Sequence, residues 1–301
     1  MPRTALLILT LLTFTAAACG SSGPTNDVKP AATVTVTSGP SAGTTDGDAT
    51  GSPSASPSSS PTSAGSQQLS VYFVRSSRVG VVHRWVPKTQ MVATAALSEL
   101  LSGLVAGEIG SGVYSTIPEG TTLRKVTIAG TVATVDLSSA FSGGSTGPHN
   151  RGLRVAQVVF TTTQFSTVKS VLLKVNGAVP SGFESTGLDL SAPLRRADLE
   201  AYTPAILVES PAINDTVGSP MKISGTANVF EGSFIARIAR DDGTVIAKKT
   251  VQASSGSGTR GTFTASIPFT TGEKKGWLVV FAPSAKDGSP TNVVKIPLAF
   301  K

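Results

Sequence analysis

Hydrophobic and polar positions alternate in short runs through most of the chain after residue 68, and this two-residue period predicts β-strands. The first run, LSVYFV at 69–74, is rich in aromatic and β-branched residues, and RWVP at 84–87 extends it or pairs with it. Over 91–104 the apolar residues recur at three and four positions instead, and glycines close the segment. This change of period predicts a helix.

The same succession of strand and helix periods continues to residue 177. The next elements are two strands joined by Ala129-Gly130, a glycine-rich loop, a second helix and a final strand, at 122–128 and 131–137, 142–150, 151–163 and 168–177. In the second helix, Leu153, Ala156, Val159 and Phe160 are expected to form the buried stripe. The order β-α-β-β-α-β predicts an α+β unit with both helices on one sheet.

A second unit begins at Pro204, after a linking stretch at 181–202 that contains a short predicted helix, LRRADLEAY. Seven short alternating segments follow, separated by turn residues such as Asp242-Gly243 and Asp287-Gly288, and no helical period interrupts them. This pattern predicts an all-β, antiparallel sandwich of the immunoglobulin type. We therefore predict one domain at 69–202 and another at 203–301.

The first 18 residues have the pattern of a secretory signal peptide. Arg3 is followed by an apolar stretch from Ala5 to Phe14 and then by three small residues that precede Cys19. The segment AAAC, followed by Gly20 and Ser21, resembles a bacterial lipobox. That resemblance implies a diacylglyceryl thioether on Cys19, cleavage before it, and a lipid anchor on the extracytoplasmic face of the cell membrane. A secreted protein with an unpaired cysteine is the alternative.

Residues 20–68 are dominated by Ser, Thr, Gly, Pro and Ala. Such a composition buries too little apolar surface to offset its ordering entropy, so the segment is predicted to be a disordered linker. Together with Cys19 it would form a tether, 19–68, whose random-coil span is about 40 Å.

Charge and cysteine content argue against a nucleic-acid partner and against disulfide bonds within the chain. The formal net charge is +7, but the basic residues are spread along the chain without a cluster of four or more Lys or Arg. A nucleic-acid interface concentrates its positive charge, so nucleic acid is not an expected partner. A single cysteine excludes disulfide bonds within the chain.

Candidate catalytic residues are few. The only two histidines, His83 and His149, do not provide a usual structural zinc set, and no nucleophile elbow, phosphate loop or dinucleotide motif is present. Asp136, Glu231 and Asp287 lie in turn or strand-end contexts, where carboxylates commonly accept hydrogen bonds. We therefore expect no catalytic residue, no metal and no cofactor, with a mixed His/carboxylate metal site as the alternative, and a structural role for Glu231.

Exposed aromatic residues and the glycine-rich loop are the candidate binding features. Trp277 and Phe281 are four residues apart in a strand and are expected to lie together in the core, whereas Trp85 and Tyr114 remain candidates for contacts. His149, Asn150 and Arg151, placed by the pattern at the end of the loop, form the predicted partner-contact site.

Several of these segments resemble a known bacterial family. ATAALSELLSG, YSTIPEGTTLRKVTI, ATVDLSSAF and QVVFTTTQFSTVKSVLLKVNG are similar in order and spacing to the GerMN domain, the sporulation and spore germination domain of envelope lipoproteins. One departure is GLVAGE after the first helix, where the family often has Gly-Pro. Residues 205–301 resemble the immunoglobulin-like domain that accompanies GerMN, through TANVFE, DDGTVIA and GTFTASIPF.

The resemblance implies a non-catalytic, membrane-anchored lipoprotein of a Gram-positive cell envelope. It would bind or assemble with envelope proteins or wall glycan, and the family's link is to sporulation and germination. The alternative is a wall-active enzyme or a regulator of peptidoglycan processing. Ligand and oligomeric state stay open.

Overall fold

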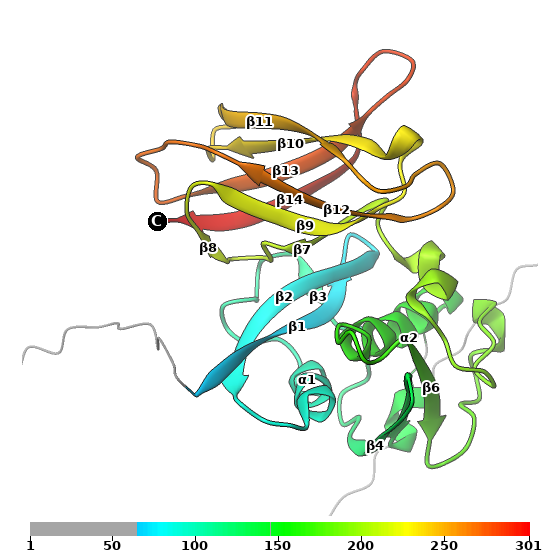
Figure 1. The fold of residues 1–301 in the computed structure, drawn as a ribbon. Helices are drawn as coiled ribbons and strands as arrows, with labels where there is room; N and C mark the ends of the chain where they lie inside the picture. Colours follow the sequence, from blue (N-terminus) through cyan, green and yellow to red (C-terminus); the bar gives the residue numbers. More distant parts are fainter. Residues whose placement is uncertain (1–64, 145) are drawn as a thin grey trace, which may run out of the picture. The chain divides into compact units, whose positions relative to one another are not determined.

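The computed structural model describes residues 65–144 and 146–301, and these described residues belong to one compact unit (Figure 1). The predicted signal peptide, Cys19 and most of the predicted linker lie outside the described residues. Within them, the α+β domain followed by an all-β sandwich is confirmed.

The first domain opens with a long β-hairpin. β1 (Ser66–Arg75) pairs antiparallel with β2 (Arg78–Pro87) along its whole length, and the short strand β3 (Val113–Tyr114) pairs with the end of β1 on its other edge. Ser76 and Ser77, which join β1 and β2, both have positive φ, as a two-residue turn of type I′ requires. RWVP is therefore the end of a ten-residue strand that returns directly along the first.

A second three-stranded sheet completes the strands of this domain. β4 (Leu123–Ala129) and β5 (Val132–Leu137) form the predicted hairpin, and β6 (Ser170–Val175) lies parallel to β5. The expectation of a single sheet is wrong in this detail, because the strands divide into the sheets β2-β1-β3 and β4-β5-β6.

Two helices pack with these sheets, α1 (Val92–Leu101) and α2 (Pro148–Thr162) (Figure 1). α2 contacts β1 of one sheet and β6 of the other. All of its residues from Gly152 to Thr162 are buried, so the expected apolar stripe describes only part of its packing. A helix that is buried on every side separates the two sheets.

The second helix begins three residues before its predicted start. Pro148 occupies the first turn, where its fixed φ suits a helix. An N–H at this position would have no acceptor within the helix, so proline loses no hydrogen bond there. His149, Asn150 and Arg151 therefore lie in the first turn of α2 and not in the loop that precedes it.

Three short 3₁₀ helices belong to the first domain and the linking stretch. η1 (Ser139–Ser142) follows β5, whereas η2 (Glu184–Thr186) and η3 (Arg196–Tyr202) lie in the stretch before the second domain. The short helix predicted there exists, with 3₁₀ geometry.

The second domain has two sheets facing one another (Figure 1). One has the order β12-β9-β7 and the other β11-β10-β13-β14-β8. The strands are β7 (Ile206–Ser210), β8 (Thr216–Val217), β9 (Met221–Ala227), β10 (Ser233–Ala239), β11 (Val245–Gln252), β12 (Gly261–Ile267), β13 (Lys275–Pro283) and β14 (Pro290–Phe300), with η4 (Phe230–Gly232) before β10. Phe234 and Phe263, one from each sheet, meet edge to face at 4.8 Å.

All seven predicted segments of this domain are strands, and β8 is the one addition. It pairs parallel with the end of β14. Among the described residues, no helix has the length and apolar character needed to cross a membrane.

Candidate functional site

The α+β domain and the sandwich meet at a cluster of polar side chains around Glu209 of β7. The Arg196 guanidinium lies 2.6 Å from the Glu209 carboxylate and 3.2 Å from the hydroxyl of Tyr72, which itself donates to Glu209. Arg196 also stacks over the rings of Tyr72 and Phe160, at 5.1 and 4.7 Å. This cluster joins β1, η3 and the second domain in one contact.

Burial determines the protonation of this cluster. Desolvation raises the pKa of the Tyr72 hydroxyl above its ordinary value, with Glu209 acting in the same direction, so the hydroxyl stays protonated and donates at neutral pH. Burial by itself would lower the pKa of Arg196, but Tyr72 and Glu209 outweigh it and the net shift is upward. Arg196 is therefore a charged, partly buried contact between the two domains.

A second contact between the domains involves His83 of β2. Its Nδ1 lies 2.7 Å from a carboxylate oxygen of Asp215, and the His83 side chain is only 8% exposed. The same Asp215 oxygen accepts the backbone N–H of Ala212 at 2.9 Å. An acid–histidine pair of this kind resembles part of a catalytic triad, but its hydrogen bonds join β2 to the turn between β7 and β8.

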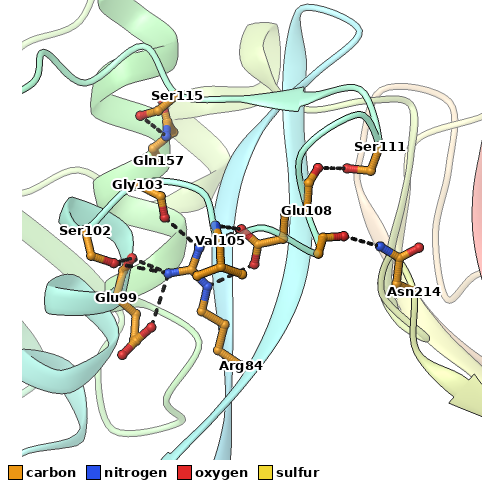
Figure 2. A network of polar contacts seen from close by, with 11 residues as sticks. Arg84, Glu99, Ser102, Gly103, Val105, Glu108, Ser111, Ser115, Gln157 and Asn214 are labelled. Atoms are coloured by element: carbon orange, nitrogen blue, oxygen red, sulfur yellow. Dashed lines mark hydrogen bonds and ion pairs between the residues drawn. The ribbon is translucent and has the colours of Figure 1, made fainter.

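The loop 102–112 of the first domain is fixed by a buried ion pair (Figure 2). Arg84 donates to both carboxylate oxygens of Glu108, at 2.9 and 2.6 Å, and also to the carbonyls of Glu99 and Gly103. Burial lowers the pKa of Arg84, but the hydrogen bond and charge of Glu108 outweigh it and raise the pKa overall. The bidentate geometry is the strong form of such a pair.

The fixed loop then meets the second domain. Asn214 donates its side-chain amide to the carbonyl of Gly107 at 2.8 Å (Figure 2). Arg84 and Glu108 thus act on the interface through the loop that they hold in place.

The linking stretch is attached to the second domain by a further bidentate pair. Arg260 donates to both oxygens of Glu200 at 2.8 Å and to the carbonyl of Pro204 at 2.9 Å, and Asn228 donates to Glu200 as well. The Arg260 hydrogen bond is the main cause of the lowered pKa of Glu200.

Between the two domains lies a groove of about 540 Å³. It is bounded by the turn end of the β1–β2 hairpin, by β7 and by residues 292–296 of β14. Its wall includes the cations Arg75, Arg78 and Lys295 and no carboxylate, whereas most of its other residues are apolar. This groove is the candidate binding site in the described part of the chain.

Two of the three residues predicted to contact a partner, His149 and Arg151, form contacts within the protein. His149 packs against Tyr202 with ring centroids 5.4 Å apart, and its Nε2 lies 3.0 Å from the carbonyl of Ser77. Arg151 donates to the carbonyls of Gly182 and Thr146, at 2.8 and 3.3 Å. Asn150 is exposed. The structure brings the three together on one helical turn, and their role in partner contact stays a prediction.

One residue of this region, Arg154, gave no signal in the sequence. It is 2% exposed and donates to three backbone carbonyls, those of Thr116, Phe141 and Gly143. Burial, with the nearby charge of Arg151, lowers the pKa of Arg154 to about 10, which leaves it charged at neutral pH. Arg154 therefore joins α2 to the start of the glycine-rich loop and to the segment that contains Thr116.

The three carboxylates considered for catalysis occupy turns and strand ends. Asp136 lies 3.3 Å from Arg124 and accepts the N–H of Gly177, and Asp287 accepts from Ser289. Within the described residues, no group of three His, Cys, Asp or Glu is placed to hold a metal ion.

Glu231 contributes its backbone to the fold. It has a φ of 54°, its N–H donates to Ser257 and its carbonyl accepts from Gln252. The structural role that we expected is present, but it belongs to the main chain of a left-handed turn and not to the carboxylate.

The expectation that Trp277 and Phe281 share the core is wrong for Trp277. Phe281 is buried, and the guanidinium carbon of Arg237 lies 4.2 Å from the centroid of its ring. Trp277 is half-buried and donates its ring N–H to Asp241. Leu278 and Val280 fill core-facing positions of β13, so Trp277 faces the outer side of the sheet. Trp85 is exposed at 65% and Tyr114 at 39%.

Family models match both domains. Residues 70–180 match the model described as sporulation and spore germination, and residues 205–289 match the immunoglobulin-like domain of bacterial spore germination. No curated protein gives a match.

Solved structures are also similar to this chain. The first GerMN domain of the sporulation protein GerM from Bacillus subtilis is 28% identical over 37% of this chain and 84% of its own, with a TM-score of 0.31. The tandem GerMN domains of the same protein are 21% identical over 67% of this chain and 61% of their own, with a TM-score of 0.40. A candidate lipoprotein from Clostridium perfringens is 16% identical over 46% of this chain and 93% of its own, with a TM-score of 0.32.

The two family models cover separate parts of the folded unit, in the order in which the domains occur. Residues 70–180 are therefore similar to the sporulation and spore germination domain, and residues 205–289 are similar to the immunoglobulin-like domain of bacterial spore germination.

Proposed function

We propose that this protein is a non-catalytic lipoprotein of the cell envelope, anchored on the extracytoplasmic face of the cell membrane through Cys19. The observation that carries the proposal is the use of the ionisable residues. His83, Asp136, Asp215 and Glu108 each form a contact that holds two segments of the fold together. What the unit offers to a partner is therefore its surface, including the groove between its domains.

The anchor is proposed from the sequence. The signal-peptide pattern ends in small residues directly before a lone cysteine, and this arrangement resembles a lipobox, at which lipid is attached. Each buried CH₂ of a lipid chain adds about 0.8 kcal/mol of membrane affinity, so a diacylglyceryl group would hold the protein at the membrane. Envelope proteins or wall glycan within reach of the linker are the proposed partners.

Membrane fractionation and intact mass of the native protein, beside a Cys19→Ala variant, test the anchor. We expect the native protein to sediment with membranes and to carry a lipid mass on Cys19, and the variant to be released. A native protein that stays soluble without the lipid mass would contradict the anchor.

Peptidoglycan turnover tests the non-catalytic part separately. We expect none above background from the purified protein. A rate that disappears in Asp136→Asn or His149→Ala would instead show a wall-active enzyme.

A further inference from the structure

We propose that the groove between the two domains binds an anionic amphiphile, a molecule with a carboxylate or phosphate head on a single apolar chain. This ligand site goes beyond the proposed anchoring, which concerns Cys19 only. The cations of the groove, the polarity along it and the state of its strand edges each support the proposal.

The three cations of the groove lack acidic partners. Among the described residues, Arg75 contacts the carbonyl of Lys295, Arg78 contacts the carbonyl of Ser77, and neither they nor the Lys295 side chain pairs with a carboxylate. Partial burial lowers the pKa of Arg75, as expected for a cation with no countercharge. A bound anion would offset that desolvation, and the planar guanidinium fits carboxylate and phosphate equally.

The groove wall combines two arginines at the hairpin turn with aliphatic residues. Arg75 and Arg78 pair with one another at the last position before the hairpin turn. Val81 lies three residues farther along β2, about 10 Å away, and Ile206, Val208 and Ile213 add to the apolar wall. The head of an amphiphile would therefore lie at the turn end and its chain among the aliphatic side chains.

The size of the groove suits a small ligand. Its volume of about 540 Å³ lies within the range of small-molecule sites, which commonly form between domains and combine apolar walls with a few polar groups.

A competing occupant is an acidic peptide added to a strand edge. Both β7 and β2 are edge strands of their sheets, so added pairing is geometrically available. On β14, however, the outward carbonyl of Lys295 is already bound by Arg75, and a new strand there would have to break this contact. β2 and β7 stay open to a peptide, but cations beside aliphatic side chains match an anionic head on an apolar chain, and for this reason we favour the amphiphile.

Calorimetric titration of the full chain carrying Cys19→Ala, in which no attached lipid competes, tests the proposal. The probes are dodecanoate and dodecyl phosphate below their micelle concentrations, with dodecyl maltoside as the uncharged control. We expect saturable binding of at least one anionic probe, and none of the maltoside. Comparison of the two anions distinguishes a carboxylate from a phosphate head.

Two changes locate the binding. Arg78→Gln, which loses one contact to a neighbouring carbonyl, is expected to weaken binding about tenfold, whereas Lys222→Gln, the same change of charge on an exposed part of β9, leaves it unaltered. Shortening the chain by one buried CH₂ is expected to weaken binding about fourfold. Hydrogen exchange should slow at 79–81 and 292–296.

Three results would overturn the site: no saturation with either anion, equal binding of the maltoside, or equal effects of Arg78→Gln and Lys222→Gln. Tighter binding of an acidic, apolar hexapeptide than of either anion would assign the groove to a peptide instead. None of these outcomes depends on whether Cys19 carries a lipid in the native protein.

Discussion

Single residues in this protein carry contacts between segments that are far apart in the sequence. Tyr72 is the clearest, since its ring packs on Phe160 while its hydroxyl reaches Glu209, 137 residues away. A buried hydroxyl that donates to a charged acceptor is worth about 1.5 kcal/mol. The residue is therefore part of both the core and the interface between domains.

Tyr72→Phe is expected to reduce the free energy of unfolding by about 1.5 kcal/mol at pH 7, because it removes the hydroxyl that donates to Glu209. The folded pKa of Tyr72 is raised above its unfolded value of about 10, so this stabilisation is present below pH 10 and is lost as the pH rises beyond it. Urea unfolding of both proteins from pH 7 to 11 measures the difference.

The two free energies should converge above pH 10, since other titrating groups are common to both proteins. A difference that stays constant across this range would show that the hydroxyl does not titrate with unfolding.

At the scale of elements, helix α2 depends on a glycine that helix propensity disfavours. A Cβ at Gly152 would lie 2.0 Å from the ring of Tyr202, which belongs to η3 and donates to the carbonyl of Thr186. The missing side chain lets the linking stretch pack directly against the helix backbone.

Gly152→Ala is expected to destabilise the protein by about 2 kcal/mol, because the clash outweighs the gain of about 1 kcal/mol in helix propensity. In a Tyr202→Leu background the same change should cost much less. Thermal unfolding of the four proteins gives the coupling energy. Gly147→Ala, which meets open space, is the control. Equal costs in the two backgrounds would contradict the close packing.

The strands of the second domain could be predicted because their signals are local. Each segment alternates, and turn residues such as Asp242-Gly243 separate neighbours that pair directly or share the sandwich. The division of the first domain into two sheets could not be predicted from the sequence, because this division depends on the position of α2. Gln157 and Thr161 interrupt the apolar stripe of α2, and both are buried through hydrogen bonds to residues distant in the sequence.

The candidate groove had no sequence signal for a related reason. Arg75 and Arg78 flank a two-residue turn, whereas Lys295 lies about 220 residues later, and only the packing of the two domains brings them to one wall. Conversely, two of the predicted partner-contact residues, His149 and Arg151, form hydrogen bonds within the chain itself.

At the scale of the molecule, ionic contacts fasten the two domains together. Arg196 is the centre of one of them, bound to Glu209 and stacked on Phe160. Removing one partner of a partly buried pair leaves the other charge without compensation, and this costs more than the intact pair contributes.

Arg196→Met is expected to reduce stability by about 2 kcal/mol and to separate the unfolding of the two domains. Calorimetry should show one transition in the native protein and two in the variant. Lys222→Met, which removes an exposed cation, serves as the control and should keep the single transition. Two transitions already in the native protein would show that the interface does not couple the domains.

The position of β1 has a mechanical consequence. Any tension that arrives through residues before Gly65 enters the folded unit at Gly65, whose carbonyl accepts from Lys88, and at Ser66, the first residue of β1. A pull directed along this strand loads its ten pairs with β2 in parallel, together with the contacts of β3 at its far end. Strands that are pulled in shear yield only when many bonds fail at once. Tyr72 and Arg75 of the same strand also form hydrogen bonds to the second domain, to Glu209 and to the carbonyl of Lys295. β1 therefore distributes the load over both domains.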